Sequence, residues 1–349
     1  MQRAFNRRRS LALLVLLAGG IASTIYLTLR RERLDRLLLE AVLRRDTAAV
    51  KTLLEQGADA NTRDMADHGP IRLADMWNAF WIHGRNAPER QNPTVLMLAT
   101  GDPAILKLLL DHGADVNAAF DSPFLGSGRT ALMIAARSDS NHAVRLLLDH
   151  GADPNRRIQG GRMDGHTALM DAAEFGRSES VELLLDRGAD VIARQGDWTA
   201  LMAAAENARA ANIRLLLGRG ADARARTNSG ITALTRAADS GCSDCIAPLL
   251  DADATDGDTA LLHAAGAGSA QTVRVLLDYG AAIEARDPEG KTALLLAVES
   301  GHSACVRLLL DRGADIHAMD ERGWTALREA WSDNRVACAR LLRQRGAVR

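Results

Sequence analysis

The sequence repeats one pattern of apolar and polar positions along most of its length. A glycine within "LLLDRGAD" or a close variant follows, in nearly every copy, 21 residues after a threonine that opens the triplet T-A-L. The distance from one such threonine to the next is the period of the repeat, and a period of about 20 to 50 residues indicates a stack of repeated supersecondary units. The triplet begins at Thr130, Thr167, Thr199, Thr232, Thr259, Thr292 and Thr325, and the variant "TVL" begins at Thr94.

One copy, "TALLLAVESGHSACVRLLLDRGAD", shows which elements the pattern predicts. Thr292 is placed to cap a short helix that Gly301 ends. Apolar residues at helical spacing in "SACVRLLL" predict a second helix, and Gly313 fits the left-handed position just past its end. The polar residues that follow predict a turn. Such a helix pair is too small to bury its own apolar face, so neighbouring copies must stack.

These residues resemble the ankyrin repeat, and "DGHTALMDAAEFGRSESVELLLDRGADV" follows that family's pattern almost letter by letter. The resemblance implies an all-α repeat solenoid of about nine helix-turn-helix units joined by β-turns, over residues 36–347. The first copy, "RLLLEAVLRRDTAAVKTLLEQGADAN", lacks the threonine. Where the family usually has Pro and His after the threonine, this chain has Ala and Met or Leu.

Three irregularities interrupt the period. The interval from Thr232 to Thr259 is only 27 residues. This predicts a shortened turn between repeats, here called the clipped finger, with Asp253 in the usual glycine position. The turns after Asn117 and Asn155 are lengthened, and we expect their tips to be exposed to solvent.

The third irregularity is an insertion at 65–92 that contains Trp77, Phe80 and Trp81. Its apolar residues recur at helical spacing and predict a short amphipathic helix. We interpret the insertion as a specialised cap on the stack. The alternatives are a helix that lies at the membrane interface and a groove that binds a partner or ligand.

The amino terminus differs in kind from the repeats. Residues 10–29, "SLALLVLLAGGIASTIYLTL", carry no charge and lie between a basic tail at 1–9 and an Arg-rich linker at 30–35. A helix of this length spans a hydrocarbon core. We predict a transmembrane signal anchor, with a cleavable signal peptide as the alternative. Because the short tail has no acidic residue, it should stay inside, which places the repeats in the periplasm.

Composition narrows the classes of function. The chain has only three Lys against 40 Arg, which we attribute to a GC-rich bacterial genome. The net charge is −1 over the whole chain, and the part beyond residue 36 is acidic. Binding to nucleic acid depends on Lys and Arg that neutralise phosphates, so we expect no nucleic-acid partner.

The sequence contains few motifs that indicate catalysis or ligand binding. We find no Gly-rich phosphate loop, no serine nucleophile elbow and no H-E-x-x-H sequence, and so predict no enzyme, cofactor, metal site or small-molecule substrate. His263 is interpreted as a surface or packing residue. Cys242 and Cys245 form a C-x-x-C motif, but Cys245 shares a repeat position with Cys305 and Cys338, so we interpret these cysteines as small buried hydrophobes.

The resemblance also implies how the protein works, because ankyrin partners are usually contacted through the turn tips and the concave helix face. Aromatic and aliphatic residues at those positions would make an apolar stripe, unless they are tucked against neighbouring turns. The candidate partner-binding residues are Phe175, Trp198, Ile231, Trp324 and Trp331, with Trp77 and Trp81 of the insertion.

We therefore expect a non-catalytic scaffold or adaptor that binds another protein in the bacterial cell envelope, held in the inner membrane by a single pass through 10–29. An inhibitor or immunity-type protein that occludes a toxin or an envelope enzyme is the alternative. A thiol-redox factor that uses Cys242 and Cys245 is a third, less favoured possibility.

Overall fold

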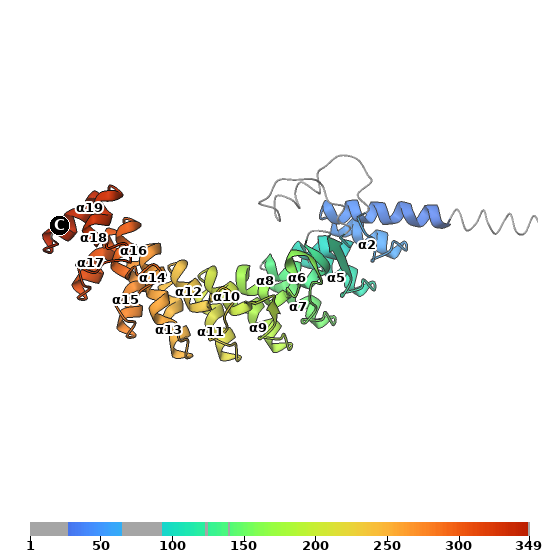
Figure 1. The fold of residues 1–349 in the computed structure, drawn as a ribbon. Coiled ribbons are helices and arrows are strands. Elements are labelled where there is room, and N and C mark those ends of the chain that lie inside the picture. Colours follow the sequence, from blue (N-terminus) through green and yellow to red (C-terminus); the bar gives the residue numbers. More distant parts are fainter. Residues whose placement is uncertain (1–26, 65–92, 123–124, 139, 348–349) are drawn as a thin grey trace, which may run out of the picture.

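Nine helix pairs stack side by side into a curved solenoid in the part of the chain that the structure describes (Figure 1). The computed structural model describes residues 27–64, 93–122, 125–138 and 140–347. The first helix of each pair lies along the concave side of the arc and the second along the convex side. The predicted architecture of an α-helical repeat solenoid is confirmed.

The helices are short and regular in length. The first pair joins a helix over 27–43 to α2 (Thr47–Glu55), so that the residues expected as a linker, 30–35, lie within a helix. The other pairs are α4 (Val95–Leu98), continued by η1 (Ala99–Gly101), with α5 (Pro103–Asp111); α6 (Ala131–Arg137) with α7 (Asn141–Asp149); α8 (Ala168–Phe175) with α9 (Ser178–Asp186); α10 (Ala200–Glu206) with α11 (Ala210–Gly218); α12 (Ala233–Asp239) with α13 (Ser243–Asp251); α14 (Gly257–Ala267) with α15 (Ala270–Asp278); α16 (Ala293–Glu299) with α17 (Ser303–Asp311); and α18 (Ala326–Ser332) with α19 (Val336–Gln344).

The repeated threonines begin these helices in the predicted way. In six copies the threonine hydroxyl accepts a hydrogen bond from the backbone N–H three residues later, which satisfies one of the amides left free at a helix start. Thr292 is also an N-cap but makes no such bond. The six capping residues are Thr94, Thr130, Thr167, Thr199, Thr232 and Thr325.

Small residues allow the repeats to approach closely. Six residues after the threonine, the six copies from Thr130 to Thr292 carry a small apolar side chain that is 0% exposed. The corresponding residue of the last copy is Trp331, which is 51% exposed. The internal residues are Ala136, Ala173, Ala205, Ala238, Ala265 and Val298.

The clipped finger is confirmed. After α13 the chain enters α14 directly, and that helix starts at Gly257, so Thr259 lies inside the helix instead of capping it. Asp253 occupies the glycine position with φ +70°, a backbone region that non-glycine residues rarely adopt. The shortened turn leaves no room for a strand between these helices.

The two lengthened turns form a composite finger. Strands β1 (Ala119–Ser122) and β2 (Gly126–Thr130) pair as an antiparallel hairpin, and Ser127 bridges to Gln159 of the following turn, which contains η2 (Gly161–Met163). A side chain at Gly126 would overlap the carbonyl oxygen of Gly160. Ile158 is buried. Most of the second turn is exposed as expected, at 156, 157, 159–162 and 164, but Gly126 and Ile158 are buried because the two turns pack on each other.

Hydrogen bonds tie the next turns together in register. The side-chain amide of Asn155 donates to the carbonyl of Gly188, and its oxygen accepts from the backbone N–H of Asp190 at 2.7 Å. Asn61 and Asn117 make the same pair of bonds to their neighbours. A second hairpin, β3 (Arg194–Gln195) with β4 (Trp198–Thr199), follows this series.

Two predicted segments fall largely or wholly outside the described residues. The membrane segment 10–29 is described only from residue 27, and the insertion at 65–92, with Trp77 and Trp81, is not described. Both remain predictions. Within the described ranges, none of the helices has the length and apolar character needed to cross a membrane.

Candidate protein-binding surface

One set of repeat positions lines the concave side of the solenoid. This set consists of the residue before each threonine and the residues four and seven after that threonine, which lie about one turn apart on the first helix. The residue before the threonine ends a finger, except Asp258, which lies inside α14. We call this set the concave row. Its charged and aromatic members are Arg129, Arg137, His166, Asp171, Glu174, Trp198, Glu206, Arg236, Asp239, Asp258, His263, Lys291, Glu299, Trp324 and Glu329.

The row begins with a buried charge cluster beneath the composite finger. Asp171 is 0% exposed, and its carboxylate faces Arg129, which is 2% exposed, and Arg137. The nearest nitrogen of each arginine lies 3.6 Å from a carboxylate oxygen. Nε2 of His166 lies 3.2 Å from Oδ1 of the same carboxylate. One acid is thus shared by three basic side chains from two adjacent repeats.

These surroundings decide the charge of Asp171. Burial by itself raises the pKa of a carboxyl group. The positive charges of His166 and Arg129 outweigh that effect, so the Asp171 pKa lies below its ordinary value. Asp171 therefore stays ionised inside the repeat stack.

His166 responds in the opposite sense. Burial alone would lower its pKa, but the Asp171 carboxylate and hydrogen bonding with Gln195 raise the pKa above its ordinary value. Nδ1–H of the protonated ring donates to Oε1 of Gln195, 2.7 Å away in strand β3. Because these groups are closed off from solvent, we assign them to holding two fingers in place, not to contact with a substrate.

The middle of the row is an open chain of contacts across three repeats. The guanidinium carbon of Arg236 lies 5.3 Å from the centre of the Trp198 ring. Its Nη1 lies 3.6 Å from Asp239. Asp239 in turn lies 2.7 Å from Nδ1 of His263, which is exposed. His263 thus pairs with an acid on the surface, in agreement with the predicted surface role.

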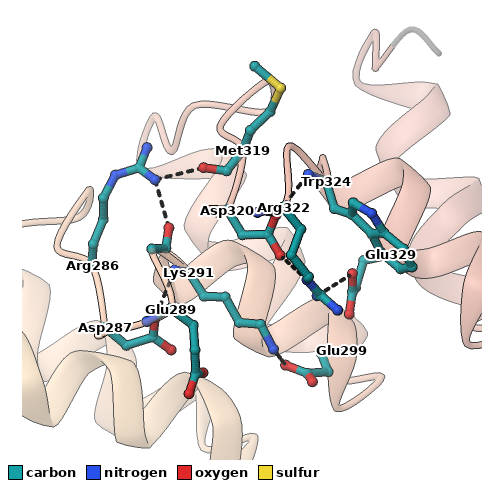
Figure 2. A network of polar contacts seen from close by, with 11 residues as sticks. Arg286, Asp287, Glu289, Lys291, Glu299, Met319, Asp320, Arg322, Trp324 and Glu329 are labelled. Carbon is teal, nitrogen blue, oxygen red and sulfur yellow. Dashed lines mark hydrogen bonds and ion pairs between the residues drawn. The ribbon is translucent and has the colours of Figure 1, made fainter.

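The row ends in a second charged group, the tip network (Figure 2). Asp320 accepts hydrogen bonds from the backbone N–H groups of Arg322 and Trp324 and from Nε of Arg322. Arg322 also lies 3.5 Å from Glu329, which belongs to α18. One repeat earlier, Nζ of Lys291 donates to Glu299 at 2.7 Å.

Arg286 connects the two fingers of this network. Its Nη1 donates to the carbonyl oxygens of Gly290, at 2.6 Å, and of Met319, at 2.7 Å. Figure 2 shows the guanidinium between the two backbone segments. The tip network therefore fixes the relative position of two neighbouring fingers by contacts with their backbones.

Arginine side chains cover most of the predicted aromatic residues. The guanidinium carbon of Arg137 lies 3.8 Å from the ring centre of Phe175, which is half-buried. Trp324, also half-buried, has Arg322 and Arg328 at 4.5 Å each. Cations over aromatic faces are attracted by the ring quadrupole. The rings of Phe175, Trp198 and Trp324 are therefore each packed against at least one arginine.

The remaining candidates are placed differently. Ile231 is half-buried, and its N–H donates to Oγ1 of Thr227 within its own turn. Trp331 lies at the end of the stack, away from the concave row, with the guanidinium carbon of Arg343 at 4.6 Å. It borders a hollow of about 300 Å³ between α18 and α19, lined by Ala330, Trp331, Asn334, Val336, Ala339, Arg340, Arg343 and Gln344.

The buried cluster is the feature that sequence reasoning missed. In the sequence, Arg129 and His166 each directly precede a threonine. The available signal was Asp171, an acid in the first helix at a position where the neighbouring copies carry Ile134 and Ala203. An ionised group at such a position needs basic partners, and the two residues before the threonines could have supplied them.

The cysteines divide into two kinds. Cys305 and Cys338 are free and buried, as predicted. Cys242 and Cys245 are joined by a disulfide, so their interpretation as unbonded hydrophobes is wrong. Burial raises the pKa of Cys305 to about 11, which keeps that thiol protonated and unreactive. In the described ranges, His, Cys, Asp and Glu form no group of three that could hold a metal ion.

Comparison with known proteins finds one family. A family model described as ankyrin repeats (3 copies) matches residues 37–158, 96–195, 193–256 and 248–320, so the matches cover the chain from 37 to 320. No curated protein matches the chain.

Proposed function

Because the chain belongs to the ankyrin repeat family, we propose that it is a non-catalytic scaffold or adaptor that binds a partner protein along the concave row. The observation that carries this proposal is the continuity of the row. From Trp198 to Glu329, charged and aromatic residues recur at the same repeat positions, and the first helices of these repeats lie along the concave side of the arc.

The chemistry of the row suits a protein partner. Aromatic residues and arginine are enriched at the centres of protein interfaces. Rings that are already stacked with arginine lose little side-chain freedom on binding, which lowers the entropic cost of association. The exposed members, such as Glu206, Asp239 and His263, add groups that can fix the register of a partner.

We propose further that the protein works in the envelope of a bacterium, anchored in the inner membrane through residues 10–29 with its repeats in the periplasm. Two features support this location. The uncharged run of 20 residues is long enough to cross a bilayer. The Cys242–Cys245 disulfide is of a kind that forms in oxidising compartments.

Photo-crosslinking within one repeat tests the binding surface. A photoreactive residue would replace His263 on α14 in one strain and Arg274 on α15 in another. Both positions are exposed, but only the first lies in the concave row. We expect a crosslinked protein adduct from position 263 and none from position 274. Adducts of equal yield from both positions, or from 274 alone, would contradict the proposal.

The same design separates an adaptor from an inhibitor. Once the crosslinked partner is identified, its activity is measured with and without the purified protein. An adaptor leaves the activity intact or preserves it over time, whereas an occluding inhibitor lowers it. Asp239→Lys should weaken either effect, and Arg274→Glu serves as the matched control.

Protease accessibility tests the location. The carboxyl-terminal repeats are probed in intact cells, in spheroplasts and after lysis, and the length of the mature chain is read from the same blot. Cleavage that begins in spheroplasts is the expected result. Protection until lysis would place the repeats in the cytoplasm and overturn the proposed orientation.

A further inference from the structure

The disulfide between Cys242 and Cys245 joins two positions that the repeat brings together without a covalent bond in the next copy. The same two positions in the next copy are Ser269 and Thr272, whose hydroxyl oxygens lie 2.8 Å apart. The backbone also matches, with φ −76° and ψ 87° at Cys242 and φ −84° and ψ 87° at Ser269. The fold therefore accommodates this pair of side chains both as a disulfide and as two separate groups.

The bond has little value as a structural cross-link. It joins residues separated by three positions in the sequence. Stabilisation by loop closure grows with the length of the loop, so a loop this short gains the least. Cys305 and Cys338 occupy the second of the two positions in later copies, but their partners at the first position are His302 and Arg335, and both cysteines are free.

The two sulfurs differ in their access to solvent. Cys245 is 0% exposed within the core, whereas Cys242 is partly exposed at the start of α13. Cys242 is the N-cap of that helix, yet no side chain caps the helix in the disulfide form. In the next copy, the hydroxyl of Ser269 accepts from the N–H of Thr272. A Cys242 thiolate would occupy the corresponding place, where helix amides stabilise negative charge.

We propose that Cys242 and Cys245 form a reversible thiol–disulfide exchange site, at which an incoming thiolate attacks Sγ of Cys242. This site is separate from the concave row and does not rest on the proposed binding function. The chemical class of its substrate is a thiol, supplied either by a small molecule such as glutathione or by the dithiol of another protein.

The exchange balances without any further oxidant or reductant. The incoming thiolate forms a bond to Sγ of Cys242 and breaks the bond to Cys245, which leaves as a thiolate and takes up a proton. A second thiolate then attacks the sulfur of the substrate in the mixed disulfide and releases Cys242. The net change converts the protein disulfide and two thiols into the protein dithiol and one new disulfide, and the reverse reaction oxidises a dithiol substrate.

Single-cysteine variants test which sulfur exchanges. The full-length chain with Cys245→Ser is incubated with oxidised glutathione and compared with Cys242→Ser, and Cys305→Ser is the control for the free thiols. We expect one glutathionyl group on Cys245→Ser, attached to Cys242, at a rate more than about tenfold above that at Cys245 in the Cys242→Ser chain. Equal rates at the two cysteines, or no adduct at Cys242, would overturn the proposal.

Reduction of the unaltered chain tests reversibility. The oxidised protein is titrated under native conditions with reduced glutathione and, separately, with reduced thioredoxin as a protein-dithiol probe. Trapped thiols are counted by mass, and helix content is followed by circular dichroism. We expect reduction by at least one probe with the helical signal unchanged, and the more effective probe indicates the source of the thiol. A disulfide that neither probe reduces until urea unfolds the repeats is a structural cross-link, and the proposal fails.

Discussion

Asp171 and Glu329 occupy the same position in two copies of one repeat, yet their surroundings shift their pKa values in opposite directions. Burial raises the pKa of Glu329, and the one nearby guanidinium, from the half-exposed Arg322, does not offset it. Burial acts on Asp171 as well, but three basic side chains outweigh it and its pKa is lowered. Charge at this position is thus favoured in one repeat and disfavoured in the other.

The difference comes from the fingers and not from the helices. Arg129 and His166 are buried at the composite finger, and both lie close to the Asp171 carboxylate. The finger that carries Asp320 is a single short turn, and Arg322 remains half-exposed on it. The same helix position therefore holds a buried acid in both repeats, surrounded by three basic side chains in one and facing a half-exposed guanidinium in the other, according to the turn above it.

The largest expected effect is the loss of charge from Asp171. Asp171→Asn removes the carboxylate that faces the buried Arg129, so the free energy of unfolding should fall by about 3–5 kcal/mol. Glu329→Gln makes the corresponding change at the other site. There the folded state already disfavours the charge, so we expect a loss below about 1 kcal/mol, or a small gain. Urea unfolding followed by circular dichroism measures the unfolding free energy of both variants. Equal losses would contradict the predicted difference between the two sites.

The pH dependence of stability sharpens the comparison. Because the folded-state pKa of His166 is above its ordinary value of 6.5, the stability that it contributes is complete below that pH. That contribution is lost as the pH rises through the folded-state pKa. The unfolding free energy should therefore decline above pH 6.5, and the decline should be smaller in His166→Gln. If the variant keeps the full slope, the assignment to His166 is wrong.

Asp171 should affect the stability of the protein at low pH. Its folded-state pKa is depressed, so its contribution is present above the ordinary value of 3.8 and is lost as the pH falls through the folded-state pKa. Unfolding measured from pH 5 downward should therefore show a steep loss in the unaltered chain. The Asp171→Asn chain, less stable at the outset, should show a shallower one.

The capping threonines provide a comparison of intermediate size. The hydroxyl of Thr199 accepts from the N–H of Met202 at 3.2 Å, whereas Oγ1 of Thr292 is buried with no hydrogen-bond partner in the described structure. Thr199→Val should cost about 1 kcal/mol because it removes the cap. Thr292→Val has the same shape change without a lost bond and should be neutral or slightly stabilising. A similar cost for both would mean that the hydroxyl bond contributes nothing.

The smallest expected effect concerns the ion pairs on the convex side. Arg219 lies 2.8 Å from Asp186 of the preceding repeat, and both side chains are exposed enough for water and salt to screen the pair. Arg219→Gln should lower the unfolding free energy by about 0.2–1 kcal/mol, and less at high salt. Thermal unfolding at two salt concentrations measures this, and a salt-independent loss would contradict an electrostatic origin.

Much of the candidate surface followed from the repeat itself. Trp198 and Trp324 each directly precede a threonine, and this position by definition puts both in the concave row. The arginines that pack against these two rings could not be predicted from the sequence. Arg236, Arg322 and Arg328 reach the rings from turns and helices whose relative distances depend on packing. Trp331 was expected in the stripe, but it lies at the end of the stack, since its position faces the place where another repeat would be.

The sequence by itself determined the repeat, its register and the N-caps of most of the first helices. Threonine at the N-cap, glycine at the left-handed position and apolar residues at helical spacing act over a few residues, so they can be recognised in a single copy. The same local rules located the clipped finger at Asp253.

Only the tertiary structure decided which charged groups are buried. Asp171 meets Arg129 and His166 because two lengthened turns fold onto each other. Burial and pairing depend on the distances between elements, which the order of residues constrains only through the packing of the whole stack.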